Sequence, residues 1–153
     1  MMIDNLKFTG KSKRKNFVKS LLEFYAESKG ISALPTDTVL MLDVLCDDLS
    51  KVKTAVYPLE LFTQEQKQLC EKNGVKAVTY SLGDMSADLV AFNRQEREAN
   101  ISYELMAQSK LARIFIARDK EYVIDDVLPS AAVLFASGEE LTDIVSTFNS
   151  LLY

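Results

Sequence analysis

The first hydrophobic and polar residues along the chain predict a strand, a turn and a helix. Residues 6–9 are apolar at alternate positions and end at Gly10. Apolar residues then recur at helical spacing between positions 18 and 25, and Gly30 is expected to end this helix. A second strand is expected over residues 31–34, ended by Pro35. A strand, a helix and a strand in this order predict a right-handed crossover between two parallel strands.

The rest of the pattern continues this alternation. Helices are expected over residues 37–49, 63–73 and 98–111, and strands over residues 76–80, 88–92, 114–117 and 131–135. Ser137, with Glu140 three residues later, suggests a capping box at the start of a last helix through Leu141 and Phe148. We therefore expect an α/β fold with a doubly wound, Rossmann- or flavodoxin-like sheet. The sheet should be five-stranded and mostly parallel, with helices on both faces.

The length and composition fit one domain with one core. The chain has 153 residues, of which 48% are hydrophobic, and we expect a single domain over residues 1–153. No apolar stretch approaches the ~20 residues of a membrane span, and no signal-peptide pattern follows the amino terminus. We expect a cytoplasmic protein without a membrane partner. Cys46 and Cys70 are then expected to be free, buried thiols.

Charge and residue types exclude several classes of function. The formal net charge is −4, and acidic residues accompany the basic ones except in the run from Lys11 to Lys19, so broad nucleic-acid binding is not expected. The chain has no histidine. This argues against zinc hydrolases and Ser-His-Asp triads, which need imidazole as a ligand or proton carrier. Any catalysis would depend on carboxylates, Tyr, Ser or Cys, and no metal or cofactor is expected.

The turn after the first strand is a candidate phosphate site. Gly10 allows close approach of the backbone, and Lys11, Ser12 and Arg14 lie where a helix amino terminus offers free N–H groups to an anion. The alternative is a solvated basic turn in which Ser12 is an ordinary N-cap. The turn does not match a Walker or dinucleotide-binding motif.

Two carboxylates form the second candidate site. Asp88 opens an apolar strand, and Glu104 is expected at the start of the following helix. Asp37, Asn93 and Asn100 are predicted to line the same crevice, because ligands of doubly wound sheets bind at the carboxyl ends of the strands. Each acid can instead be an N-cap or a surface group.

These motifs resemble those of the nucleoside 2-deoxyribosyltransferases and the related deoxynucleotide N-glycoside hydrolases. The matching segments are Phe8-Thr9-Gly10, Gly30-Ile31, Ala87-Asp88-Leu89-Val90 and Tyr103-Glu104-Leu105. The resemblance covers residues 6–34 and 87–153, and residues 36–84 are interpreted as a divergent insertion.

The resemblance implies cleavage or exchange of an N-glycosidic bond in a nucleoside or nucleotide. Glu104 would attack the anomeric carbon and form a covalent glycosyl-enzyme, since a carboxylate stabilises and then traps an oxocarbenium-like centre. Asp88 would orient the substrate or carry a proton, and Tyr103 would position Glu104. The resemblance also implies a homo-oligomer.

Departures from the family pattern leave other functions open. Met106 stands where the family has Gly, Glu98 where phosphate-using relatives have Ser, and Ala112-Arg113-Ile114 where the family has Gly-Lys-Pro. One alternative is an inactive module that binds or sequesters a nucleotide. Another is a protein-interaction scaffold that docks through residues 36–84.

Overall fold

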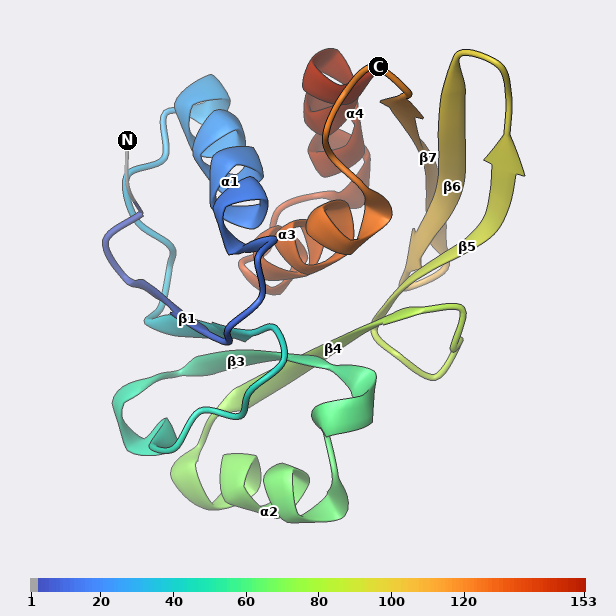
Figure 1. The fold of residues 1–153 in the computed structure, drawn as a ribbon. Coiled ribbons are helices and arrows are strands. Elements are labelled where there is room, and N and C mark those ends of the chain that lie inside the picture. Colours follow the sequence, from blue (N-terminus) through green and yellow to red (C-terminus); the bar gives the residue numbers. More distant parts are fainter. Residues whose placement is uncertain (1–2) are drawn as a thin grey trace.

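The computed structural model describes residues 3–153 and shows an α/β fold built on one seven-stranded sheet (Figure 1). The strands lie side by side in chain order, from β1 to β7. They are β1 Leu6–Thr9, β2 Thr38–Met41, β3 Thr54–Pro58, β4 Lys76–Leu82, β5 Leu89–Glu96, β6 Asn100–Ala107 and β7 Lys110–Ala117. The helices are α1 Lys15–Lys29, α2 Gln64–Asn73, α3 Ile124–Ala136 and α4 Leu141–Leu152, with 3-10 turns η1 Leu49–Lys51 and η2 Leu59–Leu61.

The sheet has seven strands, which corrects the expected number of five, and it is mixed. The expected mostly parallel, Rossmann-like arrangement is not confirmed. Strands β1 to β5 pair in parallel, whereas β5, β6 and β7 pair antiparallel. Residues 36–84 supply the three strands β2, β3 and β4. The α/β class is confirmed.

Helices cover the two faces of the sheet unequally. Helices α1, α3 and α4 lie on one face, and α2 lies on the other (Figure 1). The larger core packs these three helices against the sheet and includes Tyr25, Leu105 and Phe148. A smaller core on the other face joins β2 and β3 to α2 and η1, with Tyr57 and Cys70 among its members.

The predicted helix over residues 98–111 is wrong. These residues form β6, the following turn and the start of β7. The turn residues Gln108 and Ser109 have φ angles of 50° and 66°. This left-handed conformation is usual in tight hairpins, but there Gly and Asn are the common residues. The turn therefore carries no strong sequence signal.

The predicted strand over residues 131–135 is also wrong, because these residues belong to α3. Helix α3 is buried on nearly all sides, so its apolar residues form a continuous run that resembles a buried strand. Residues 31–34 lie in a loop, and β2 replaces the first part of the helix predicted over residues 37–49.

Helix α4 follows residue 140 as predicted, but the capping box does not form. Its N-cap is Glu140, which makes no side-chain cap bond. The hydroxyl of Ser137 donates to the carbonyl of Val133 at the end of α3 instead, at 2.8 Å.

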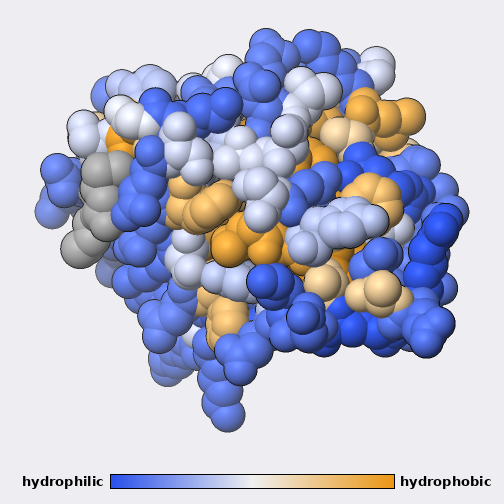
Figure 2. All heavy atoms as spheres, turned by 90° about the horizontal axis from the view of Figure 1, so that it is seen from above, coloured by the Kyte–Doolittle hydropathy of each residue, from blue (hydrophilic) through white to orange (hydrophobic). Residues whose placement is uncertain are grey.

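The cysteines agree with the expectation from composition. Cys46 and Cys70 are free and buried. No helix within residues 3–153 is long and apolar enough to cross a membrane. Seen from above, the surface is mostly hydrophilic, with apolar side chains gathered near the middle of that face (Figure 2).

Candidate ligand site at the carboxyl edge of the sheet

A cavity of about 250 Å³ lies at the carboxyl ends of the parallel strands. Strands β1 to β4 each lead into its wall, and α3 closes it from above the sheet. Its lining residues are Ser12, Arg14, Val18, Leu42, Asp43, Pro58, Glu60, Tyr80, Asp125, Leu128 and Pro129. Ligands of open α/β sheets bind at these carboxyl ends of the strands. The predicted residues Ser12 and Arg14 both line the cavity.

The turn between β1 and α1 is held against the segment that follows β2. The backbone N–H of Lys11 donates to Oδ1 of Asp43 at 2.9 Å. Gly10 has a φ of 142°, and a Cβ at this position would clash with the same carboxylate oxygen. Gly10 therefore fits here for two reasons, its backbone angle and the lack of space. The carboxylate of Asp43 therefore binds a turn amide that was a candidate donor to a ligand anion.

Arg14 is engaged inside the protein. Its guanidinium donates to the Asp126 carboxylate from Nε at 2.8 Å and from Nη2 at 2.5 Å. Nη2 also donates to the carbonyl of Glu121, and the guanidinium carbon lies 4.0 Å from the centre of the Phe17 ring. The bonds to Asp126 raise the pKa of Arg14 above its ordinary value. Arg14 thus fixes the start of α1 against α3.

Carboxylates line the rim of the cavity, and two lysines lie next to it on the β1–α1 turn. Asp43, Glu60 and Asp125 are all exposed, and they come from three different elements. Lys11 and Lys13 are exposed on the β1–α1 turn, and neither forms an ion pair within residues 3–153. This region can therefore bind a ligand that carries both positive and negative charges.

Tyr80 forms part of the cavity wall. Its hydroxyl donates to the carbonyl of Met41 at 2.8 Å. Burial raises the pKa of the phenol, and the nearby rim carboxylates raise it further. A phenol that stays protonated and hydrogen-bonded to the backbone supports the wall and does not serve as a base at neutral pH. Over the part of the chain that the structure describes, no group of three or more Cys, Asp or Glu residues is arranged to hold a metal ion.

The structure does not bring Glu104 and Asp88 together. Glu104 lies in the middle of β6, opposite Phe92 of β5, four positions beyond Asp88. Its carboxylate is paired with Arg113 at 3.0 Å. Oδ2 of Asp88 accepts from the backbone N–H of Thr79 at 2.8 Å. Thr79 belongs to β4, on the other side of β5 from Glu104.

The other predicted site residues are also spread over the molecule. Tyr103 lines a separate cavity of about 350 Å³ at the carboxyl ends of β5 and β7. Asn93 lies at an irregularity of β5 and donates to Glu104 at 3.3 Å. Asn100 begins β6, and its buried Oδ1 has no hydrogen-bond partner within residues 3–153. Asp37 precedes β2, at the amino end of that strand.

Sequence reasoning missed Asp43, Glu60, Tyr80 and Asp125. Asp43 and Glu60 follow β2 and β3, so the rule that ligand groups cluster after parallel strands would have identified them. That signal was lost because residues 37–49 were predicted to be a helix and β3 was not predicted. A correct strand assignment was therefore the missing step.

Solved structures of Mur ligases share this fold. MurF from Acinetobacter baumannii superposes with a TM-score of 0.67 at 13% identity, covering 95% of this chain and 46% of that chain. MurF ligase from Thermotoga maritima in complex with ADP gives 0.58 at 12% identity, covering 95% and 48%. UDP-N-acetylmuramate:L-alanyl-gamma-D-glutamyl-meso-diaminopimelate ligase from Neisseria meningitides gives 0.58 at 11% identity, covering 95% and 64%. No protein-family model and no curated protein sequence matches the chain.

These comparisons contradict the resemblance to the nucleoside 2-deoxyribosyltransferases. Mur ligases are a different family from the nucleoside 2-deoxyribosyltransferases, so that resemblance and the N-glycosidic reaction drawn from it are wrong. The short motifs misled because strand–turn–helix segments of similar composition recur in unrelated α/β folds. Identities of 11–13% show a shared fold alone. The chain spans about half the length of the MurF chains. The expected homo-oligomer rested on the earlier resemblance only and stays a prediction.

Proposed function

We propose that the chain binds a nucleotide as its magnesium complex in the cavity at the carboxyl edge. The observation that carries the proposal is a cavity lined by carboxylates, next to a turn whose lysines form no ion pair within residues 3–153. The fold is also found in a ligase crystallised with ADP. The proposal concerns binding and assigns no reaction.

The charges of the rim favour a metal–nucleotide complex over a free nucleotide. Mg²⁺ is commonly held by one or two protein carboxylates together with phosphate oxygens and water. Glu60 and Asp125 can supply such carboxylates, because neither forms an ion pair within residues 3–153. Lys11 and Lys13 can attract the phosphates. Without the metal, the phosphates would face the three rim carboxylates at close range, which is unfavourable.

The test is a titration of the protein with ADP by calorimetry, in excess Mg²⁺ and again in EDTA. We expect binding with Mg²⁺ and an affinity at least about tenfold weaker in EDTA, since one lost charge-assisted contact is worth roughly 1.5–3 kcal/mol. Glu60→Gln and Asp125→Asn should reduce the difference between the two conditions. Glu65→Gln, on α2 at the other face of the sheet, is the matched control. Equal affinity in both conditions, or no heat at millimolar ADP, would overturn the proposal.

The lysines are tested separately. The double variant Lys11→Ala/Lys13→Ala should weaken ADP binding and reduce its dependence on salt, because fewer cations then face the phosphates. Lys67→Ala/Lys72→Ala on α2 removes the same charge far from the cavity and should leave the affinity unchanged. Equal losses in both double variants would indicate a general charge effect and would count against this site.

A further inference from the structure

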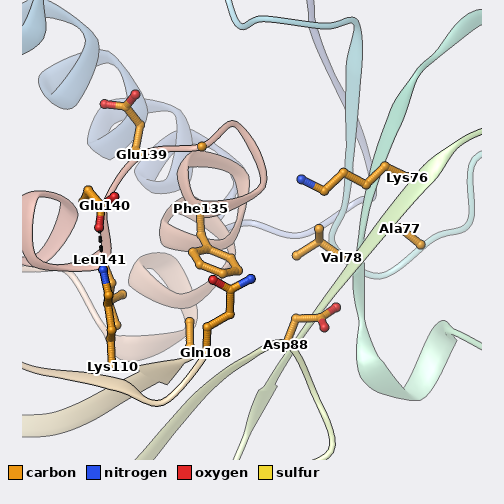
Figure 3. Close-up of a pocket in the computed structure, with 12 residues that line it drawn as sticks. Lys76, Ala77, Val78, Asp88, Gln108, Lys110, Phe135, Glu139, Glu140 and Leu141 are labelled. Atoms are coloured by element: carbon orange, nitrogen blue, oxygen red, sulfur yellow. Dashed lines mark hydrogen bonds and ion pairs between the residues drawn. The ribbon is translucent and has the colours of Figure 1, made fainter.

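A second cavity, of about 320 Å³, lies at the opposite edge of the sheet. Its wall is formed where β4 and β5 begin, where β6 turns into β7, and where α3 leads into α4 (Figure 3). Segments far apart in the sequence therefore meet around one hollow. It is separate from the carboxyl-edge cavity, because β4 runs from one to the other: Lys76 at its start lines this cavity, and Tyr80 lines the first.

Some charged groups of this cavity are already satisfied by protein partners. Lys110 and Glu140 form an ion pair at 2.9 Å, which raises the pKa of the amine and lowers the pKa of the carboxyl. Oε1 of Glu139 accepts from the hydroxyl of Tyr25 at 2.7 Å. These residues shape the wall.

Three other polar groups keep unused hydrogen-bonding capacity. The ammonium of Lys76 donates to the carbonyl of Ala136 at 3.1 Å and forms no ion pair within residues 3–153. Lysine has three N–H donors, so two remain. Within residues 3–153, both hydrogen bonds to the Asp88 carboxylate use Oδ2, which leaves Oδ1 able to accept. The side-chain amide of Gln108 forms no hydrogen bond within the part of the chain that the structure describes.

These groups lie around an apolar floor. Figure 3 shows the Gln108 amide beside the ring of Phe135, with Asp88 and Lys76 on the side formed by β4 and β5. The other apolar residues of the lining are Ala77, Val78, Ala107 and Leu141. An occupant can thus contact one cation, one carboxylate and one amide while it covers apolar surface.

We propose that this cavity binds a small zwitterion of the amino-acid or short-peptide class. Its carboxylate would contact Lys76, its ammonium would contact Asp88, and its apolar side chain would pack on Phe135. Asp88, Glu139 and Glu140 would repel a simple anion, whereas Lys76 and Lys110 would repel a simple cation. A molecule with both charges matches both groups, and the volume is within the usual range for small-ligand pockets.

The experiment uses nuclear magnetic resonance of the whole chain, with L-leucine and glycyl-L-leucine as probes. Leucinamide, which lacks the carboxylate, and 4-methylpentanoate, which lacks the amine, are the comparison arms. We expect the zwitterions to shift the backbone signals of residues 76–78, 88 and 108. Each comparison compound should bind at least about tenfold more weakly, because one charge of the cavity then stays unpaired.

Two variants test the assigned contacts. Lys76→Gln retains a donor for the Ala136 carbonyl but loses the charge, and it should weaken the zwitterions while leaving leucinamide unchanged. Asp88→Asn should do the converse, weakening the zwitterions and leaving 4-methylpentanoate unchanged. Lys72→Ala on α2 is the control, and magnesium-dependent ADP binding should persist in all three variants, since that cavity is separate. The proposal is wrong if neither zwitterion shifts these signals at about 50 mM, or if all four compounds bind equally.

Discussion

At the scale of single residues, Asp126 joins the starts of two helices through one carboxylate. The side chain is completely buried. It accepts from Arg14, which precedes α1, and from the backbone N–H of Val123, which precedes α3, at 2.9 Å. A buried carboxylate is tolerated while all three of its hydrogen-bond donors are present. Removing one partner destabilises the folded protein, because a buried polar group is then left unpaired.

We predict that Asp126→Asn destabilises the protein by about 2–3 kcal/mol. Loss of one partner of a buried ion pair costs roughly 3–5 kcal/mol, and the side chain of Arg14, which is 34% exposed, recovers part of this from water. Asparagine also has only one acceptor oxygen, so one donor stays unsatisfied. Urea unfolding followed by circular dichroism measures the change.

The neighbouring Asp125→Asn is the matched control for stability, since Asp125 is exposed. It should change the free energy of unfolding by less than about 0.5 kcal/mol. Equal effects of the two substitutions would show that the Arg14–Asp126 pair contributes little.

At the scale of elements, α4 protects the outer edge of β7. The side-chain amide of Asn149 accepts from the backbone N–H of Phe115 at 2.9 Å and donates to the carbonyl of Arg113 at 3.1 Å. It thereby takes the place of a neighbouring strand. Uncovered edge strands tend to pair with other chains.

We predict that Asn149→Ala lowers stability by about 1–2 kcal/mol, since two partly buried backbone groups lose a partner. It should also increase self-association, because the freed edge of β7 can pair with another chain. Thermal unfolding and light scattering measure the two effects. Ser146→Ala, at an exposed position of the same helix, should show neither. A variant whose stability and self-association equal those of the unchanged protein would mean that water replaces the amide without cost.

The elements that could be predicted from sequence have local boundaries. Helices α1 and α2 end at Gly30 and Gly74, whose φ angles of 69° and 65° are the left-handed values that glycine favours. Strands β1, β4 and β5 have short apolar patterns with clear limits. Helix α3 could not be predicted in this way, because its burial on nearly all sides is set by packing with the sheet and α1. Pro129 lies inside this helix, although proline more often ends or breaks a helix.

The candidate site shows the same division. The position of Ser12 and Arg14 beside a strand end followed from the local pattern. Two contacts did not follow from that pattern. Arg14 binds Asp126, 112 residues further along, and the backbone of Lys11 binds Asp43. Such pairings depend on which elements become neighbours, and a single sequence holds no local trace of them.

At the scale of the whole molecule, buried tyrosines couple the fold to alkaline pH. Burial raises the pKa of Tyr25, Tyr57 and Tyr80 above the ordinary value of 10.0. Their hydroxyl groups donate to Glu139, Gln66 and Met41, respectively. They lie in both cores, so their ionisation affects both faces of the sheet.

We predict that the protein unfolds cooperatively above pH 10 and that these phenols ionise in the same step. Because the folded pKa exceeds the unfolded value, the stabilisation is complete below pH 10 and is lost as pH rises toward the folded pKa. Phenolate absorbance and circular dichroism, recorded together, should show a late rise in absorbance that coincides with loss of structure. In denaturant, all tyrosines should titrate together near pH 10. If the folded protein reached full phenolate absorbance near pH 10 with its circular dichroism unchanged, these three phenols would have to be open to water in the native state.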